Sequence, residues 1–221
     1  MSLSFPLASR FRGYLPVVID IETGGFNASE HAMLEFAAVL LDYDGAHLTP
    51  ARTLHYHIEP AEGTVIDPAA IKFNGIDPYN PLRGAIPEGE ALRDFYREIR
   101  HTMRMESCTR AVVVAHNAAF DHGFLSAATA RQQIKRSPFH PFSSIDTASL
   151  SALAFGHNVL SRACELAGIE FDAGQAHTAI YDAEQTARLF CEIVNRWQRL
   201  GGWPLPESDA DADNRADKTA Y

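Results

Sequence analysis

The chain has 221 residues, of which 46% are hydrophobic and 21% charged, a composition typical of one soluble globular domain with a sizeable core. It has no apolar run near the roughly 18 residues of a membrane span, no signal-peptide pattern and only three, widely spaced cysteines, so we expect a cytoplasmic protein with no membrane partner. The formal net charge of −9 argues mildly against broad nucleic-acid binding but is compatible with a local basic patch.

The first half of the chain predicts three strands. The apolar residues 17–19 run into Asp20 and are typical of a buried strand, and the patterns at 33–42 and 53–58 predict a second and a third. Short turns between successive strands favour an antiparallel meander. The segment 63–89 contains several prolines and predicts a long, irregular but ordered connection.

The second half alternates helices and strands. Helices are predicted at 90–105, 118–133, 148–155, 159–167 and 177–197, and strands at 111–115 and 143–147. This order predicts an α/β fold with a mixed sheet, in which the strand at 111–115 lies parallel beside the first strand. Residues 206–221 are rich in Asp and Ala and are expected to be a disordered acidic tail, which leaves residues 1–205 as the domain.

Two carboxylates mark the end of the first strand. Asp20 and Glu22 are two residues apart, so in a strand they point to the same face. Two such charges repel each other unless a cation joins them, and a hard divalent metal is the usual partner. Two solvated acids at a strand end are the simpler alternative for this pair alone.

Three further polar residues fall near the starts of helices. Asp121 lies early in the predicted helix 118–133, and His177 precedes Asp182 by five residues at the start of the last helix. Singly, each is more often a helix-capping acid or a surface histidine. Together with Asp20 and Glu22 they make four carboxylates at the ends of adjacent elements, enough to hold two divalent ions for phosphodiester chemistry.

These residues form three motifs that resemble those of the DEDDh 3′–5′ exonucleases, a family with a ribonuclease H-like fold. The motifs are Asp20-Ile21-Glu22-Thr23-Gly24, Asn117-Ala118-Ala119-Phe120-Asp121, and His177 with four residues before Asp182. Matching segments of one exoribonuclease branch are Arg10-Phe11-Arg12-Gly13, Pro16-Val17-Val18-Ile19-Asp20, Phe73-Asn74-Gly75-Ile76, His140-Pro141-Phe142 and 190–197. The resemblance covers about residues 10 to 205 and implies a ribonuclease H-like mixed sheet flanked by helices.

The resemblance also implies a mechanism. Asp20 would bridge two Mg²⁺ ions, which Mn²⁺ can replace; Glu22 and Asp182 would complete the site of the attacking water. Asp121 would serve the second metal near the leaving oxygen, and His177 would take the proton of the water. The implied activity is 3′–5′ exoribonuclease trimming of single-stranded 3′ ends of structured RNAs such as tRNA, which releases nucleoside 5′-monophosphates.

Aromatic residues near the acids are candidates for gripping the 3′ end. The resemblance implies that Phe26, Phe73, Phe120 and Phe142 stack on the last bases, although most phenylalanines pack in cores. Phe26 follows a Gly-Gly turn and Phe73 lies in the long segment, so these two are favoured. Some family members carry a Glu where this chain has Ala69, so discrimination against a terminal cytosine is absent here or rests on Phe26 and Phe73.

Six basic residues complete the set of candidates: Arg10, Arg12, Arg104, Arg110, Lys135 and Arg136. Solvated surface charge is the usual explanation for such residues. The resemblance implies instead a patch on one subunit that guides RNA into the active site of its partner in a homodimer.

Other functions fit the sequence less well. A DNA exonuclease for proofreading or repair would carry the same motifs, because nothing in them reads the 2′-hydroxyl. A nucleic-acid-binding module that has lost catalysis is disfavoured by the intact set of five catalytic residues. A phosphatase with an Asp nucleophile also begins with a strand and two acids. Such an enzyme would need a Lys or Arg from a later strand to bind the phosphate, and no motif in this sequence matches that requirement.

Overall fold

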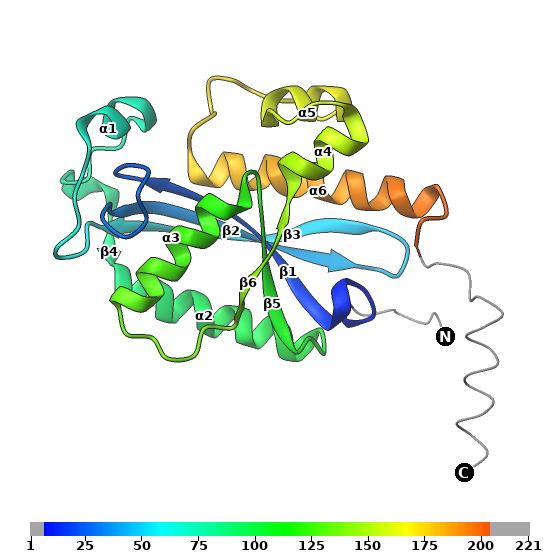
Figure 1. The fold of residues 1–221 in the computed structure, drawn as a ribbon, viewed down its shortest axis with the longest axis horizontal. Helices are drawn as coiled ribbons and strands as arrows, with labels where there is room; N and C mark the ends of the chain where they lie inside the picture. Colours follow the sequence, from blue (N-terminus) through cyan, green and yellow to red (C-terminus); the bar gives the residue numbers. More distant parts are fainter. Residues whose placement is uncertain (1–6, 204–221) are drawn as a thin grey trace, which may run out of the picture.

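Between residues 7 and 203, six strands form one sheet in the order β4-β3-β2-β1-β5-β6, with helices on both faces (Figure 1). The computed structural model describes residues 7–203, so the tail predicted at 206–221 lies outside the described residues. The strands are β1 Tyr14–Thr23, β2 Met33–Tyr43, β3 Leu48–Glu59, β4 Ile86–Pro87, β5 Arg110–Ala115 and β6 Phe139–Asp146. The helices are α1 Pro68–Asn74, α2 Glu88–Met105, α3 Ala118–Arg131, α4 Thr147–Phe155, α5 Leu160–Ala167 and α6 Ala179–Arg199, with 3-10 turns at Leu7–Ser9, Phe11–Gly13 and Pro81–Arg83.

The strand pairing confirms the predicted mixed sheet. β1, β2 and β3 form the antiparallel meander, in which Val18 of β1 pairs with Val39 of β2. β5 lies parallel to β1, with Val113 beside Val17, and β6 lies parallel to β5. The apolar run of β5 is fully buried, as its sequence predicted, because β5 lies between β1 and β6 and both faces of the sheet are covered there.

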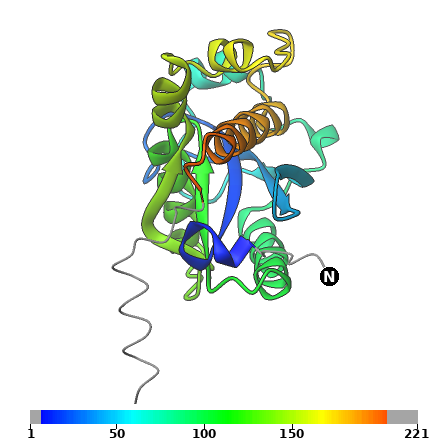
Figure 2. The same ribbon diagram turned by 90° about the vertical axis from the view of Figure 1, so that its right-hand side faces the viewer.

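Helices α2 and α6 cover opposite faces of the sheet (Figure 2). Phe36 of β2 packs edge-on against Phe95 of α2, with ring centroids 4.6 Å apart. Since successive side chains of a strand alternate between faces, Glu35 points to the other face, where it lies in register beside Glu22 of β1. The apolar face therefore holds α2, and the polar residues at the end of β1 face α6.

Several predicted boundaries differ from the structure, and three of them have a clear cause. β3 begins at Leu48 instead of 53, because Leu48 still pairs with β2. β6 begins at Phe139 instead of 143, because Phe139 pairs with Ala111 of β5. The last helix begins at Ala179 instead of 177, because His177 has a left-handed backbone with φ of 66°.

The prediction of an irregular segment at 63–89 was wrong for α1. Asp67 accepts a hydrogen bond from the backbone N–H of Ala69 at 2.8 Å, and Pro68 follows at the first helical position. Gly75, with φ of 71°, ends the helix in the left-handed conformation that glycine adopts without strain. Both caps are local signals, and together they support a helix of only two turns.

Within residues 7–203, no helix is both long and apolar enough to cross a membrane.

A buried ion pair joins α2 to α3. Arg131 donates to both carboxylate oxygens of Glu88, with Nε–Oε2 and Nη2–Oε1 distances of 3.0 and 2.8 Å. Gln132 adds a third hydrogen bond to Oε2 at 2.9 Å. The side chain of Glu88 is only 1% exposed, so removal of either partner leaves a buried charge without its counter-ion.

We predict that Glu88→Ala lowers the free energy of unfolding by about 3 kcal/mol, because it strands the guanidinium of Arg131. Urea unfolding followed by circular dichroism would measure this. The matched control is Glu165→Ala in the exposed Arg162–Glu165 pair, which should change stability by no more than ~0.5 kcal/mol. Equal effects in the two variants would contradict the assigned role of Glu88.

Candidate active site

Four acids predicted from sequence come from three elements that meet beside the end of β1. Asp20 and Glu22 lie on β1, Asp121 in the first turn of α3 and Asp182 in the first turn of α6. Carboxylate oxygens of Asp20, Glu22 and Asp182 lie within 4.8 Å of one another. Asp121 is near enough for its charge to raise the pKa of Asp20. The structure therefore brings all four predicted carboxylates together.

Burial and mutual repulsion raise the pKa values of these carboxyl groups. Burial raises the pKa of Asp20 well above its usual range, and the charges of four acidic neighbours, the other three acids of the cluster and Glu35, raise it further. For Glu22, burial and then the charges of Asp182 and Glu35 raise the pKa to about 8. Burial also raises the pKa values of Asp121 and Asp182. A positive charge placed among these groups would reverse this effect.

The donor set fits a hard divalent cation. Every ligand that the four acids offer is a carboxylate oxygen, which is the type that Mg²⁺ and Mn²⁺ prefer. Oδ1 of Asp182 is buried and has no hydrogen-bond partner within the described part of the chain. Such an orphaned oxygen is costly unless a cation or water completes it. The acids of this site therefore satisfy the requirements of a metal centre.

His177 lies directly before α6. Its backbone N–H donates to Oδ2 of Asp182 at 3.0 Å, which fixes the chain at this point. Its exposed imidazole lies against Phe73, with ring centroids 4.5 Å apart. The structure thus places His177 between an acid of the cluster and an aromatic ring of α1.

Helix α1 is tied to the end of β1, which explains how Phe73 reaches the acids. The side-chain amide of Asn74 donates to the carbonyl of Thr23 at 3.1 Å, and the backbone N–H of Asp67 donates to the carbonyl of Gly24 at 2.7 Å. A hydrogen bond from Asn74 also moderates the raised pKa of Glu22. Sequence reasoning missed Asn74, although the caps of α1 could have placed it at a helix end.

The four candidate phenylalanines differ in exposure. The rings of Phe26, Phe73 and Phe142 are largely open to solvent, with Phe26 86% exposed. Phe120 is half-buried, packs on Phe124 at 4.9 Å between centroids, and meets Phe26 edge-on at 6.4 Å. Phe26 and Phe73 are therefore available to stack on another flat ring beside the acids, whereas Phe120 mainly supports Phe26. Phe142 lies against His140, whose ring contacts Tyr14 at the other end of β1, so the structure does not bring Phe142 to the acids.

The basic candidates do not gather at the acids. Arg110 begins β5 in register with Tyr14 of β1, and the guanidinium of Arg12 lies 5.7 Å from the centre of the Tyr14 ring. Tyr14 precedes Asp20 by six residues, which is about 20 Å along an extended strand. Arg12 and Arg110 therefore lie at the opposite end of β1 from the acids.

The remaining basic candidates vary in accessibility. Arg104, Lys135 and Arg136 are exposed, on the last turn of α2 and in the connection from α3 to β6. Arg10 is only 6% exposed; its guanidinium donates to Oε1 of Gln198 at 2.6 Å and lies over the ring of Trp203. In this chain Arg10 is thus a buried contact to the end of α6, and Arg12 is the accessible arginine of this segment.

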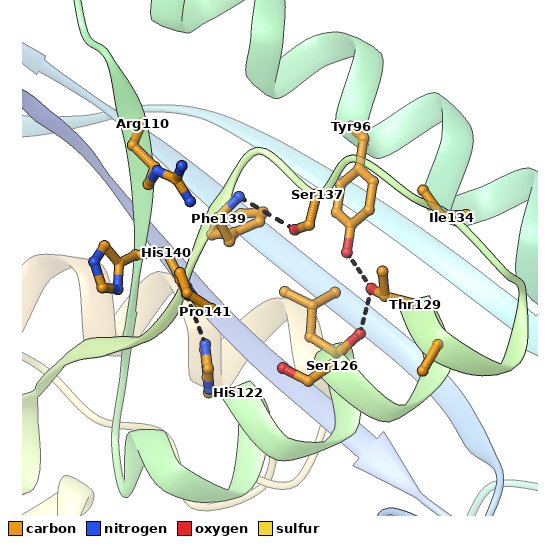
Figure 3. Close-up of a pocket in the computed structure, with 12 residues that line it drawn as sticks. Tyr96, Arg110, His122, Ser126, Thr129, Ile134, Ser137, Phe139, His140 and Pro141 are labelled. Carbon is orange, nitrogen blue, oxygen red and sulfur yellow. Dashed lines mark hydrogen bonds between the residues drawn. The ribbon is translucent and has the colours of Figure 1, made fainter.

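A pocket of about 420 Å³ lies between α2, α3, β5 and β6, away from the four acids. Arg110, His122 and His140 line one side of it, and Tyr96 and Thr129 the other (Figure 3). Among the described residues, none of the four acids lines this pocket or the two others found. This pocket is therefore separate from the acid cluster.

Comparisons with known proteins agree on one family. An exonuclease family model, RNase_T, matches residues 17–190. Ribonuclease T of Enterobacter sp. (strain 638) is 58% identical over 204 residues, which cover 92% of this chain and 91% of that protein. Ribonuclease T of Pectobacterium atrosepticum is 56% identical, with 94% of each chain covered.

Solved structures share the fold. E. coli exonuclease I in complex with a dT13 oligonucleotide superposes with a TM-score of 0.64 at 18% identity, over 86% of this chain. The chain spans less than half of that protein, 43% of its length. The superposition supports the predicted ribonuclease H-like fold. Since the family model and the curated relatives each cover most of the sequence, this chain belongs to the ribonuclease T family of exonucleases.

Proposed function

We propose that this chain is a 3′–5′ exoribonuclease that trims single-stranded 3′ ends of structured RNAs, including tRNA, and releases nucleoside 5′-monophosphates. The observation that carries the proposal is the cluster of Asp20, Glu22 and Asp182, whose carboxylate oxygens lie within 4.8 Å of one another beside Asp121. Curated relatives that share more than half of the sequence are ribonucleases, which favours RNA as the substrate.

The four acids would hold two Mg²⁺ ions, with Mn²⁺ as a substitute. Asp20 has the central position, because its charge interacts with all three other acids. When bound, the cations make a water molecule more acidic and neutralise negative charge on the phosphate. The raised pKa values and the orphaned Oδ1 of Asp182 support this assignment.

His177 would accept the proton of the attacking water at a ring nitrogen. Its exposed ring and its backbone hydrogen bond to Asp182 place it at the edge of the acid cluster. Such a base typically contributes 10²–10⁴-fold to a rate. Phe26 and Phe73 would stack on the terminal bases and so deliver the last phosphodiester to the acids, each stack being worth ~1–3 kcal/mol.

Two subunits would act together. Arg12 and Arg110 lie about 20 Å from the acids of their own chain, so they are poorly placed to guide RNA to that site. In a homodimer the same residues can face the acids of the partner. Their positive charge would attract the RNA backbone to an otherwise acidic protein.

A DNA exonuclease remains the second candidate. The related fold of exonuclease I, seen with a dT13 oligonucleotide, is the observation that favours it. Stacking on Phe26 and Phe73 would accept either sugar, because every base offers a π-face. Matched RNA and DNA oligonucleotides of one sequence distinguish the two candidates by their rates of hydrolysis.

We predict that Asp20→Asn lowers the rate of 3′-end hydrolysis by about 10³-fold, because cation stabilisation of the transition state is worth several kcal/mol. The assay follows shortening of a 5′-labelled tRNA with a single-stranded 3′ end, in Mg²⁺ and then in EDTA. Asp42→Asn, at an exposed position of β2, is the matched control and should retain the wild-type rate. Substantial hydrolysis by folded Asp20→Asn protein would exclude the proposed metal site.

We predict that the metal-free protein becomes less stable as the pH rises from 5 to 8. The pKa of Glu22 is about 8 in the fold, against 4.5 as its ordinary value, so the folded chain holds a proton that the unfolded chain has released. The stability gained from that proton is complete below pH 4.5 and is lost as the pH passes through 8. Each 2 kcal/mol lost would lower Tm by roughly 4–8 °C.

Thermal unfolding at several pH values, with EDTA or with Mg²⁺, tests this pH dependence. Both Mg²⁺ and the substitution Glu22→Gln should flatten it, because each removes the protonation of this carboxylate. A pH dependence that is identical in Glu22→Gln and wild type would show that another group is responsible.

We predict that two inactive variants complement each other if the patch acts across subunits. One variant is Asp182→Asn; the other is Arg12→Ala with Arg110→Ala, since Arg10 is buried. Random mixing makes about half of the dimers hybrids. In each hybrid, one of the two active sites has all its acids and faces an intact patch on the other subunit. Activity should therefore return to about a quarter of that of wild type. Arg162→Ala, on the exposed face of α5, is the control for the loss of a surface charge. If hybrid dimers form and stay as inactive as the parents, the patch does not act in trans.

A further inference from the structure

A second cluster of potential ligands lies beside the acids on the same face of the sheet. It consists of Glu35 on β2 and of His55 and His57 on β3. Glu22, Glu35 and His57 occupy one row across β1, β2 and β3, so this second cluster continues the line of the catalytic carboxylates. One ligand atom from each of Glu35, His55 and His57 lies within 4.8 Å of the others.

The strand geometry holds the three side chains together. His55 and His57 are two residues apart on β3 and therefore point to the same face, with ring centroids 4.6 Å apart. Nε2 of His55 lies 2.6 Å from Oε1 of Glu35. Nδ1 of His57 is buried and lacks a hydrogen-bond partner among the described residues, so the cluster is incomplete as it stands.

We propose that Glu35, His55 and His57 bind a transition-metal dication, with Zn²⁺ as the ion they fit best. Two imidazoles and one carboxylate are a recurring zinc ligand set, and imidazole favours Zn²⁺ over Mg²⁺. Ligand atoms around a tetrahedral zinc lie roughly 3.4 Å apart, as bonds of about 2.1 Å require. This value lies between the 2.6 Å that separates His55 from Glu35 and the 4.8 Å limit of the cluster, so the side chains need only small adjustments, with the His55–Glu35 pair moving slightly apart. Binding of the ion through Nε2 of His55 would replace the hydrogen bond to Glu35, and the proton of the neutral imidazole would then be carried by Nδ1.

The charges around the cluster favour a cation on balance. Arg83 is the opposing group; its guanidinium donates to the carbonyl of Leu34 at 2.6 Å and acts on both Glu35 and His57. On the other side, the charge of Glu35 acts on Glu22 and Asp20, so two further carboxylates lie near. Neutralisation of Glu35 by a bound ion would relieve this repulsion.

The cluster is also accessible. The side chain of His55 is 27% exposed, whereas that of Glu35 is 8% exposed. An ion can therefore enter past His55 and reach a more enclosed carboxylate. Once bound, the ion would join β2 to β3 next to Glu22. Its ligands would be two imidazoles and one carboxylate, which distinguishes this site from the four-acid site.

Calorimetric titration of the full chain with Zn²⁺, in excess Mg²⁺ that fills the four carboxylates, tests the proposal. Wild type should bind one Zn²⁺ at this site. The double variant His55→Gln/His57→Gln should lose this binding event, because its affinity for Zn²⁺ at the site is lowered at least about 100-fold. The matched control is His47→Gln/His101→Gln, which removes two exposed histidines outside the cluster and should keep the wild-type stoichiometry.

A second measurement covers the case in which the double variant does not fold. Cu²⁺ bound to wild type in the same buffer should give an electron paramagnetic resonance spectrum with coupling to two imidazole nitrogens, and the single variant His57→Gln should reduce it to one. Equal Zn²⁺ uptake by wild type and a folded double variant would overturn the proposal. Absence of two-nitrogen coupling in wild type would overturn it as well.

Discussion

Repulsion among carboxylates at the end of β1 is the constraint on which the rest of the site depends. Asp20, Glu22, Asp121 and Asp182 are held close together and largely out of water, and each has its pKa raised as a result. A fold does not gather such charges for its own stability. The sheet, α3 and α6 must therefore be rigid enough to hold them, and the apolar face under α2 supplies that rigidity.

Around these acids, the chain uses backbone groups and amides to position flexible parts. The N–H of His177 binds Asp182, and Asn74 ties α1 to the carbonyl of Thr23. As a consequence, Phe73 and His177 meet at the edge of the cluster although 104 positions separate them in the sequence. The exposed rings of Phe73 and His177 thus lie beside buried carboxylates, as the proposed stacking of a single-stranded end requires.

The positive charges have a different distribution from the one that sequence reasoning alone suggests. Arg12 and Arg110 lie at the far end of β1, and Arg10 is buried against Gln198. The separation of acids from bases within one chain has a physical advantage, because Arg side chains beside the four carboxylates would compete with the metal ions. In the proposed homodimer, the second subunit would supply the positive charge at the active site.

The sequence alone determined most of the architecture. Apolar runs predicted β1, β2 and β5, and helical periodicity predicted α2, because these patterns reflect burial along a single element. The residues of the acid cluster were also predictable, since Asp20 and Glu22 share a strand face and Asp121 and Asp182 open helices. Family motifs then linked them, which no single pattern would have done.

Only the tertiary structure decided the rest. The pairing of Glu35 with His55, the burial of Arg10 and the contact between Phe73 and His177 all join residues distant in sequence, and no local pattern encodes such contacts. Helix α1 lies between these cases, because its caps at Asp67 and Gly75 are local but its placement over the acids depends on Asn74 and Thr23. Local preferences are set by neighbouring residues along the chain, whereas the environment of each charge is set by whatever the fold packs against it.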